Sequence, residues 1–363
     1  MICRINGGED MPQTVIYSEK RADQMEHFLT KNDVVLDLAG ELPKDASSRT
    51  YYRLNHHDKK VILMDAPAEA DRVEPFIIVA NHLNALGLNA PDIYAQDVED
   101  NFLLLEDYGN NTFSKMMNDG HDPEDLYELA VDALAHMHMH PQATDIHLPA
   151  FGRDELQIEA GLLPNWYYAA KTGKEPTDVF KKEWVEAWDK VIEALPEIEQ
   201  TMVLRDFHCD NLMFVPGYSG IRRCGMLDFQ SAVIGALPYD LVSLLENDRR
   251  AVPEAMQERL LERYFSKTEI KDKDAFMTWY RFMSGQRQSK VLGIFYRLYI
   301  RDHKSGYMKF IPQVIKLLEH SFKDPMFAPV VDVISKHIGT LTFVEDFDLE
   351  AVRALKLNNE LPL

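Results

Sequence analysis

The chain has 363 residues, of which 46% are hydrophobic and 27% charged, a composition typical of a folded protein with one large domain or two modest ones. At this length roughly 75% of the surface of the unfolded chain is buried on folding, so stability requires neither disulfides nor a structural metal. Acidic residues outnumber basic ones by 59 to 39, and the net charge of −20 disfavours nucleic acid and anionic lipid surfaces as partners.

The first part of the chain has the pattern of a sheet with helices. Residues 1–10 are polar and precede a second methionine, Met11, that could equally begin translation, so we expect a disordered extension there. The remaining apolar patterns predict helices at 20–30 and 69–86 and antiparallel strands at 34–38, 51–54, 61–64, 93–95 and 102–105.

From residue 123 the pattern becomes helical, beginning with a helix at 123–138 that has proline in its first turn. Further helices are predicted at 177–194, 239–248, 253–265, 274–300 and 308–322. The exception is a strand at 202–204 that leads through a polar loop into a hairpin, 212–215 and 224–227.

These patterns predict an α+β fold of two lobes. We expect an antiparallel-sheet N-lobe over residues 11–106 and a mainly helical C-lobe with an embedded β-hairpin over residues 107–363. The seam between the lobes is predicted near residues 107–111.

The cysteines and the apolar runs bear on the cellular compartment. Cys3, Cys209 and Cys224 are odd in number and form no C-x-x-C pair, which argues against a disulfide framework and for a reducing environment. The longest apolar runs, such as 76–80, fall far short of the roughly 18 residues of a membrane span, and the polar start lacks the apolar core of a signal peptide. We therefore expect a cytoplasmic protein that does not contact a membrane.

Three polar residues around the hairpin predict the chemistry. Asp206 and Asn211 lie in the loop before it, and Asp228 directly follows its second strand. A loop carboxylate can accept the proton of an attacking hydroxyl, while an amide oxygen and a second carboxylate are hard ligands for Mg²⁺ on the phosphates of ATP. The D-x-x-x-x-N spacing alone is weak, since chance gives about one in a chain this long, but its place between a strand and a hairpin makes solvated loop acids the less favoured alternative.

With these motifs the chain resembles the aminoglycoside phosphotransferase and choline kinase family of the protein-kinase-like fold. The D-x-x-x-x-N and L-D-F motifs are shared by the whole family, whereas D-A-S-S-R and M-D-A-P are specific to its bacterial anomeric sugar kinases, which phosphorylate N-acetylmuramate and N-acetylglucosamine. The likeness covers roughly residues 20–320, and it is carried by segments 45–54, 61–67, 102–109, 205–213 and 227–246.

The resemblance implies two lobes with ATP between them. It makes Asp206 the catalytic aspartate and gives Mg²⁺ the ligands Asn211 and Asp228. A hinge near Glu106 would hold adenine by backbone groups. The turn that covers the β- and γ-phosphates would contain three further candidates, Ser47, Ser48 and Arg49.

The sequence departs from the family pattern on one strand, where Met64 occupies the position that usually carries a phosphate-binding lysine. Arg49 or Arg53 could supply the missing charge, or each is a solvated strand residue. Two smaller departures are Leu204, which replaces a histidine that often precedes Arg-Asp, and an apparent insertion at 41–44 before the phosphate-covering turn.

For the acceptor, Trp166 falls where the sugar-binding helices of the family lie, and its flat face can contact a sugar ring; packing beneath a helix is the alternative. His208, two residues past the catalytic aspartate, is a second substrate candidate, with loop bracing as the alternative. Asp240 matches a family aspartate that we expect to brace the catalytic loop. A metal site is not predicted at the cluster His136, His138 and His140, because no carboxylate or cysteine completes it.

We therefore predict an ATP- and Mg²⁺-dependent kinase that converts a small-molecule sugar to its 1-phosphate in peptidoglycan recycling, with a functional link to a sugar 1-phosphate nucleotidyltransferase. The signatures of P-loop, dinucleotide-binding, serine hydrolase and zinc protease enzymes are not found, and no A-P-E follows L-D-F as in protein kinases. Two alternatives stay open: an aminoglycoside phosphotransferase, which the acidic charge favours mildly, and a non-catalytic ATP-binding module, which the methionine on the strand suggests.

Overall fold

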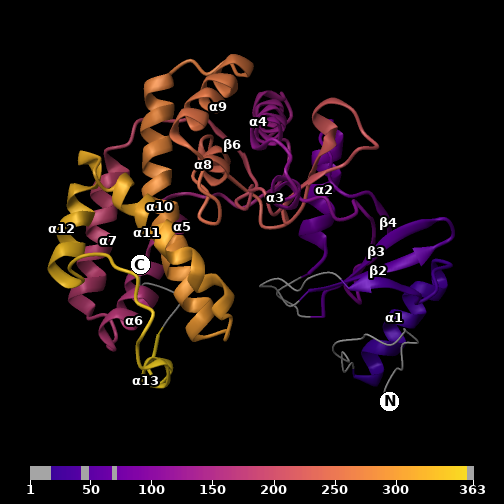
Figure 1. Cartoon of the computed structure of the whole chain (residues 1–363), viewed down its shortest axis with the longest axis horizontal. Coiled ribbons are helices and arrows are strands. Elements are labelled where there is room, and N and C mark those ends of the chain that lie inside the picture. The colour runs from indigo at the N-terminus through magenta and orange to yellow at the C-terminus, as the bar shows by residue number, and fades with distance from the viewer. Residues whose placement is uncertain (1–17, 42–48, 68–71, 358–363) are drawn as a thin grey trace. The chain divides into compact units, whose positions relative to one another are not determined.

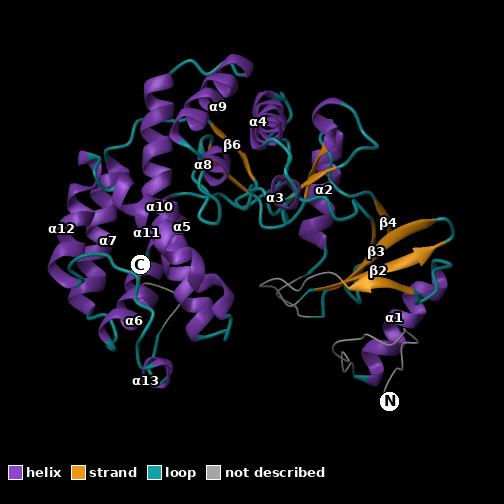
Figure 2. Cartoon of the chain, in the orientation of Figure 1, coloured by secondary structure: helices purple, strands orange, loops and turns teal. Residues whose placement is uncertain are grey.

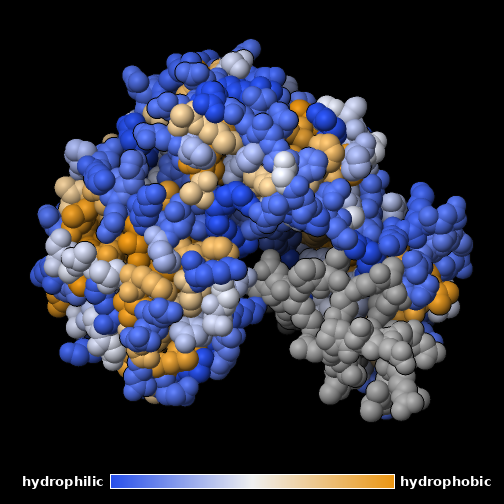
Figure 3. Space-filling view, in the orientation of Figure 1, coloured by the Kyte–Doolittle hydropathy of each residue, from blue (hydrophilic) through white to orange (hydrophobic). Residues whose placement is uncertain are grey.

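The computed structural model describes residues 18–41, 49–67 and 72–357 and has the predicted α+β architecture (Figure 1). Ser47, Ser48 and the extension predicted at residues 1–10 lie outside the described residues. Hydrophilic residues cover most of the face seen in Figure 3, as a chain of net charge −20 leads one to expect. Within the described ranges, no helix has both the length and the apolar character needed to cross a membrane.

The chain divides into two compact units. Unit 1 comprises Met1–His121 and Asp210–Ser231, and unit 2 comprises Asp122–Cys209 and Ala232–Leu363. Two segments of the predicted C-lobe group with the sheet in unit 1: residues 107–121 and the hairpin segment Asp210–Ser231. The lobe boundary at residues 106 and 107 stays a prediction.

Unit 1 is built on a five-stranded antiparallel sheet with the order β1-β2-β3-β5-β4 (Figure 2). In β3, at its centre, the residues from Val61 on are buried, which accounts for the unbroken run V-I-L-M. His57, in the left-handed conformation at φ 52°, belongs to the two-residue turn between β2 and β3. The strands are β1 (Leu38–Glu41), β2 (Thr50–His56), β3 (Lys59–Asp65), β4 (Ile93–Asp97) and β5 (Phe102–Glu106).

Three helices belong to the same unit: α1 (Glu19–Lys31), α2 (Glu74–Ala85) and α3 (Phe113–Asn118). The strand predicted at 34–38 is wrong, since β1 begins only at Leu38. Val34 instead donates its N–H to the Leu29 carbonyl (2.9 Å) and so closes the C-terminus of α1. Its side chain is buried with α1 in the core, and it is unavailable to the sheet ladder.

The hairpin strands β7 (Leu212–Phe214) and β8 (Cys224–Met226) join unit 1 through backbone hydrogen bonds. The Asn89 carbonyl accepts the Met226 N–H at 2.8 Å, and the Asn111 carbonyl accepts the Phe214 N–H at 2.8 Å. Gly225 allows this close approach, because a Cβ there would lie 2.7 Å from a ring carbon of Tyr108. These contacts explain why the hairpin packs with the sheet.

Unit 2 is mainly helical, with one two-stranded sheet of β6 (Gln200–Val203) and β9 (Val233–Ala236). The predicted helices are found, and α5, α6, α12 and α13 were not predicted. The helices are α4 (Pro123–Met139), α5 (Arg153–Ala160), the π-helical turn η2 (Leu163–Tyr167), α6 (Tyr168–Thr172), α7 (Asp178–Glu193), α8 (Tyr239–Leu245), α9 (Glu254–Lys267), α10 (Lys273–Ile300), α11 (Ile311–Ser321), α12 (Ala328–His337) and α13 (Leu349–Arg353).

Helix α10 is the longest element and contacts α5, α8 and α11 (Figure 1). Gly293 permits tight packing, since a Cβ there would lie 2.3 Å from the backbone of Leu162. Residues 284–290, S-G-Q-R-Q-S-K, are all buried although only the glycine is non-polar. Buried polar groups require partners, so this segment indicates a charged interior beside α10.

Candidate active site

The loop that follows β6 is held by a buried carboxylate from α8. One oxygen of Asp240 accepts the backbone N–H of Leu204 at 2.6 Å, and the other accepts that of Arg205 at 2.9 Å. Arg205 has a φ of +72°, a left-handed conformation that is costly for a residue with a Cβ. The prediction that Asp240 braces this loop is confirmed, and the brace fixes the backbone immediately before Asp206.

Side chains of opposite charge surround the same loop inside unit 2. Glu159 forms ion pairs with the guanidinium of Arg205 and, at 2.8 Å, with the ammonium of Lys290. Lys290 also donates to the Tyr239 hydroxyl at 3.1 Å. The loop is thereby connected to α5 and α10 through charges that are largely withdrawn from water, where pairing counts most.

The two aspartates of this region have pKa values displaced in opposite directions. Burial raises the pKa of Asp206, but the charges of Lys290, His208, Arg287 and Arg205 outweigh burial and hold it below its ordinary value. Burial raises the pKa of Asp240 to about 7, although its two backbone hydrogen bonds act to lower the pKa. Asp206 is therefore ionised at neutral pH and can accept a hydrogen bond from a hydroxyl.

The other predicted residues meet at the end of the hairpin in unit 1. The Asn211 amide nitrogen lies 3.4 Å from Asp228 Oδ2, although the two residues are 17 apart in sequence, and the Leu227 N–H donates to the Asn211 carbonyl at 2.9 Å. Asp228 takes the left-handed conformation at φ +58°. Gln230 donates to Asp228 Oδ1 at 2.6 Å.

This pair suits Mg²⁺. Magnesium is held by one or two carboxylates together with water and substrate phosphates, rather than by an all-protein cage. The carboxylate of Asp228 and the amide oxygen of Asn211 supply such a partial set of hard ligands. In the part of the chain that the structure describes, no three His, Cys, Asp or Glu side chains form a metal cage of another kind.

The structure thus places the predicted catalytic residues in both units. Asn211 and Asp228 lie together in unit 1, whereas Asp206 belongs to unit 2. Only four residues of chain separate Asp206 from Asn211.

The predicted hinge residue, Glu106, lies at the end of β5. Its backbone N–H donates to the Asp92 carbonyl at 2.8 Å, and its carboxylate accepts the Tyr218 hydroxyl at 3.1 Å. Burial raises the pKa of Glu106. Its side chain therefore connects the sheet with the turn of the hairpin, and adenine binding at this position stays a prediction.

The strand position without a lysine is confirmed as apolar, since Met64 is fully buried in β3. Of the two arginines that could replace the lysine, Arg53 forms a 2.6 Å ion pair with Asp107 and donates to the Asn110 side chain at 2.8 Å. Arg53 is therefore held within unit 1 by its own partners. Whether Arg49 or Arg53 contacts a phosphate stays a prediction.

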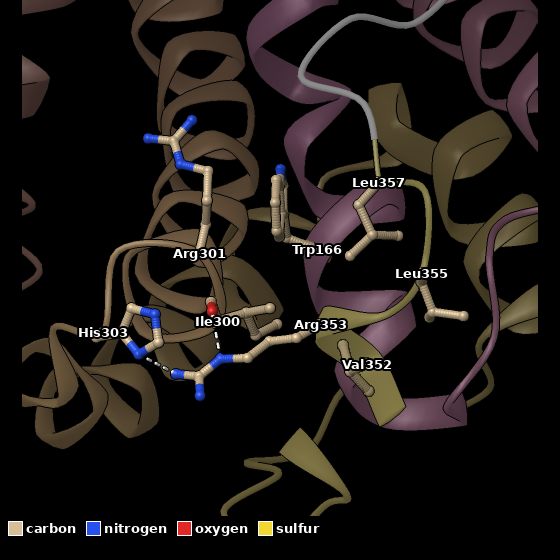
Figure 4. Close-up of a pocket in the computed structure, with 8 residues that line it drawn as sticks. All are labelled: Trp166, Ile300, Arg301, His303, Val352, Arg353, Leu355 and Leu357. Atoms are coloured by element: carbon tan, nitrogen blue, oxygen red, sulfur yellow. Dashed lines mark hydrogen bonds between the residues drawn. The ribbon is translucent and has the colours of Figure 1, made fainter. Parts of the chain in front are cut away.

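The two substrate candidates lie in different surroundings. His208 is buried in the catalytic loop, and its charge is among those that lower the pKa of Asp206. Trp166 lies on η2 and lines a cavity with the end of α10 (Figure 4). Ile300 in this cavity and Lys290 near the loop are ten residues apart, or about 15 Å along a helix, so the contact of Trp166 with the acceptor stays a prediction.

His138, from the histidine cluster, and two of the cysteines lie in buried surroundings. His138 is buried against the Tyr264 hydroxyl at 2.6 Å, and burial lowers its pKa to about 3. Cys209 and Cys224 are buried.

Sequence reasoning missed the residues that surround the predicted ones. Glu159, Arg287 and Lys290 hold or polarise the loop that contains Asp206, and Gln230 donates to the Asp228 carboxylate. The one available signal was the polar run 284–290 inside an otherwise apolar helix, since consecutive polar residues cannot all face water on a helix packed on several sides.

Comparison with known proteins gives close sequence relatives. The model of the phosphotransferase enzyme family matches residues 39–277. An N-acetylmuramate/N-acetylglucosamine kinase from Caulobacter vibrioides is 30% identical over 360 residues, covering 90% of this chain and 99% of that protein. A protein of the same name from Pseudomonas aeruginosa is 34% identical over 283 residues, covering 76% of this chain and 81% of that protein.

Solved structures of lower identity share the fold. Choline kinase from Streptococcus pneumoniae has a TM-score of 0.59 at 12% identity, with 84% of this chain and 100% of that chain covered. An ADP-bound aminoglycoside phosphotransferase has a TM-score of 0.56 at 14% identity, with 83% of this chain and 99% of that chain covered. The predicted protein-kinase-like fold is confirmed.

Proposed function

The chain belongs to the phosphotransferase enzyme family, and from this membership we propose that it transfers the γ-phosphoryl group of ATP to the anomeric hydroxyl of N-acetylmuramate and N-acetylglucosamine. Family and relatives make it an ATP-dependent sugar kinase; the two sugars, the anomeric position and a place in peptidoglycan recycling are the proposal. A sugar 1-phosphate is suited to nucleotidyl transfer, so the proposal includes a functional link to a nucleotidyltransferase that consumes the product.

The observation that carries the proposal is the clamped, ionised carboxylate of Asp206. Asp240 fixes the backbone before it, and the neighbouring cations keep it charged. We assign Asp206 to the acceptor hydroxyl, whose oxygen it orients toward the γ-phosphorus. As the new O–P bond forms and the bond to the ADP oxygen breaks, the hydroxyl proton passes to the carboxylate and then to solvent.

A carboxylate of lowered pKa is a weak base. Asp206 therefore acts chiefly by orientation, and it takes the proton late, when bonding to phosphorus has made the hydroxyl more acidic. In the loose transition state of phosphoryl transfer, little negative charge is needed on the nucleophile, which suits such a base.

We assign Asn211 and Asp228 to Mg²⁺. An ion held there would neutralise negative charge on the phosphates of ATP. Gln230 bonds one Asp228 oxygen, which limits rotation of the carboxylate and leaves its Oδ2 beside Asn211.

The proposal is tested by phosphorus NMR of the purified protein with MgATP and either N-acetylmuramate or N-acetylglucosamine. We expect a sugar 1-phosphate signal with an equal amount of ADP, and no product from Asp206→Asn. Asp132→Asn is the matched control, because it removes a carboxylate that pairs with Arg263 on the α4–α9 side of unit 2.

Other outcomes would contradict specific parts of the proposal. Phosphorylation of kanamycin but of neither sugar would make the protein an aminoglycoside phosphotransferase. ATP binding without turnover on any sugar, aminoglycoside or choline-like alcohol would support the non-catalytic alternative. A 6-phosphate product would retain the sugar and refute the anomeric position.

A further inference from the structure

One buried arginine of unit 2 has more hydrogen-bond donors than the chain has acceptors for it. Arg287 lies in the polar segment 284–290 of α10, and its side chain is 5% exposed. A guanidinium carries N–H donors on each of its nitrogen atoms. Among the described residues only Asp248 accepts one of them, with Oδ1 at 3.2 Å from Nη1. Because buried polar groups are nearly always hydrogen-bonded, the other donors of Arg287 indicate a partner from outside the chain.

The second cation of this segment is occupied by the chain itself. Lys290 follows Arg287 by three residues, a spacing that places both side chains on one side of a helix. The Lys290 ammonium lies 2.8 Å from Glu159 and donates to the Tyr239 hydroxyl at 3.1 Å. Glu159 also pairs with Arg205. Lys290 therefore holds the loop in place, whereas Arg287 keeps donors on the same side of α10.

Arg287 is close enough to the loop for its charge to act on Asp206. Burial acts to lower the pKa of Arg287, but Asp248, Tyr239 and Asp206 outweigh burial and raise it. Helix α10 also contacts α8, which carries the Asp240 clamp (Figure 1). If Asp206 holds the anomeric hydroxyl of a sugar, a side chain this near to it lies beside the substituents next to the anomeric carbon.

The charges around Arg287 favour a neutral oxygen over a carboxylate as its further partner. The cations and carboxylates that pair or interact in this region are equal in number: Arg205, Arg287 and Lys290 against Glu159, Asp206 and Asp248. Asp240 and Glu246, whose pKa values are raised by burial, also interact with Arg287, and His208 adds positive charge only when it is protonated. A further carboxylate would therefore add unbalanced negative charge beside Asp206.

The two proposed sugars differ in this respect. Both carry an acetamido group on C2, next to the anomeric carbon, and only N-acetylmuramate carries a lactyl carboxylate, on C3. The amide carbonyl oxygen is a good hydrogen-bond acceptor without a net charge. It therefore suits the spare donors of Arg287 better than the lactyl carboxylate does.

We propose that Arg287 binds the acetamido carbonyl oxygen of the acceptor and so determines specificity for 2-acetamido sugars. The inference rests on the proposed function, because it takes Asp206 to hold the anomeric hydroxyl of such a sugar. Arg287 bonds Asp248 through Nη1 and donates to the carbonyl oxygen through Nη2 or Nε. Recognition of a group that both sugars share explains how one site accepts both.

The test is a ratio of two values of kcat/KM, measured by phosphorus NMR with N-acetylglucosamine and with N-trifluoroacetylglucosamine. Fluorine withdraws electrons from the amide, so the trifluoroacetyl oxygen is a weaker hydrogen-bond acceptor. We expect the wild type to prefer the acetyl sugar about fivefold or more, since bonds from a charged donor are among the strongest. A change in the ionisation of Asp206 affects both sugars alike and leaves this ratio unchanged.

Two variants show whether the preference depends on Arg287. The double variant Asp248→Asn with Arg287→Met removes the buried ion pair without leaving a single charge behind, and we expect its ratio to fall to nearly one. Asp248→Asn alone is the matched control, because it keeps Arg287 and an acceptor oxygen for it, and its ratio should stay near that of the wild type. If the double variant is inactive, Arg287→Lys gives the same comparison, since it keeps the charge but not the planar fork, and we expect a reduced ratio.

Three results would overturn the inference. An unchanged ratio in the double variant or in Arg287→Lys denies the contact with the carbonyl oxygen. An equal fall of the ratio in Asp248→Asn assigns the effect to the ion pair and not to the donors of Arg287. A loss confined to N-acetylmuramate assigns Arg287 to the lactyl carboxylate. Failure of the proposed function is a separate result, because the wild type itself would then phosphorylate neither N-acetylglucosamine nor N-acetylmuramate.

Discussion

The residues that we assign to the chemistry are held by different means in the two units. In unit 2, the loop that contains Asp206 is fixed by a buried carboxylate and by ion pairs that reach α5 and α10. In unit 1, Asn211 and Asp228 are brought together by a β-hairpin, and Gln230 donates a hydrogen bond to the Asp228 carboxylate. A group that orients a nucleophile needs one fixed position, whereas ligands of a metal that arrives with ATP need freedom to adjust.

This comparison predicts that replacing Asp206 and replacing Asp228 cause different defects. We expect Asp206→Ala to lower kcat by about three orders of magnitude while MgATP binds nearly as before, because the carboxylate acts only on the acceptor. Asp228→Ala should weaken MgATP but leave the weaker binding of metal-free ATP unchanged. Calorimetric titration of ATP with and without Mg²⁺ measures both. Equal loss of MgATP binding in the two variants would contradict the assignment of Asp206 to the acceptor and Asp228 to the metal.

The pH dependence of stability tests the clamp in unit 2. The pKa of Asp240 is raised by burial to about 7, so the folded state favours its protonated form. Its contribution to stability is complete below the pKa of the unfolded chain, near 3.9, and is lost as pH rises toward 7.

We therefore expect the unfolding free energy of wild type, relative to Asp240→Asn, to fall by up to about 4 kcal/mol between pH 4 and 8. Urea unfolding at a series of pH values measures this difference. A difference that is constant with pH would show that Asp240 has an ordinary pKa. The matched control is Asp132→Asn, whose carboxylate is not clamped by backbone N–H groups.

Replacing Glu159 is expected to change the unfolding free energy by a smaller amount, again because a buried charge is involved. Glu159→Gln leaves Lys290 and Arg205 without their shared anion in a buried setting, and we expect a loss of about 3 kcal/mol of unfolding free energy. The double variant Glu159→Gln with Lys290→Met should regain part of this loss, because it removes one unpaired charge. A double variant that is less stable than the sum of the single changes would refute the pairing.

The residues that we assign to the chemistry could be named from the sequence, whereas the residues that hold them in place could not. Asp206, Asn211 and Asp228 stand at the ends of short strands, where local patterns show them. Their supports come from elsewhere: Glu159 precedes Asp206 by 47 residues, and Lys290 follows it by 84. Only the fold brings such positions together, and one sequence carries no record of the pairing.

The wrong strand prediction at 34–38 has the same cause, because the sequence does not record which groups meet in the fold. The apolar run at 34–38 has strand composition, but the N–H of Val34 is used to end α1, a three-dimensional fact that composition does not contain. In contrast, the strands predicted at 51–54 and 61–64 lie within β2 and β3, whose antiparallel pairing depends on neighbours in the chain.

The smallest predicted effect lies in unit 1, at Gln230. Its amide donates to one oxygen of Asp228, so Gln230→Ala should let the carboxylate rotate without removing a ligand. Loss of such an outer hydrogen bond typically weakens metal affinity about tenfold, so we expect a tenfold higher Mg²⁺ requirement with kcat restored at saturating Mg²⁺. Gln230→Glu is the informative companion, because a second carboxylate would repel Asp228 and deepen the defect at low Mg²⁺. If Gln230→Ala instead lowered kcat at every Mg²⁺ concentration, the position of the Asp228 carboxylate would have to be as fixed as that of Asp206. The contrast between a fixed loop in unit 2 and adjustable metal ligands in unit 1 would then be wrong.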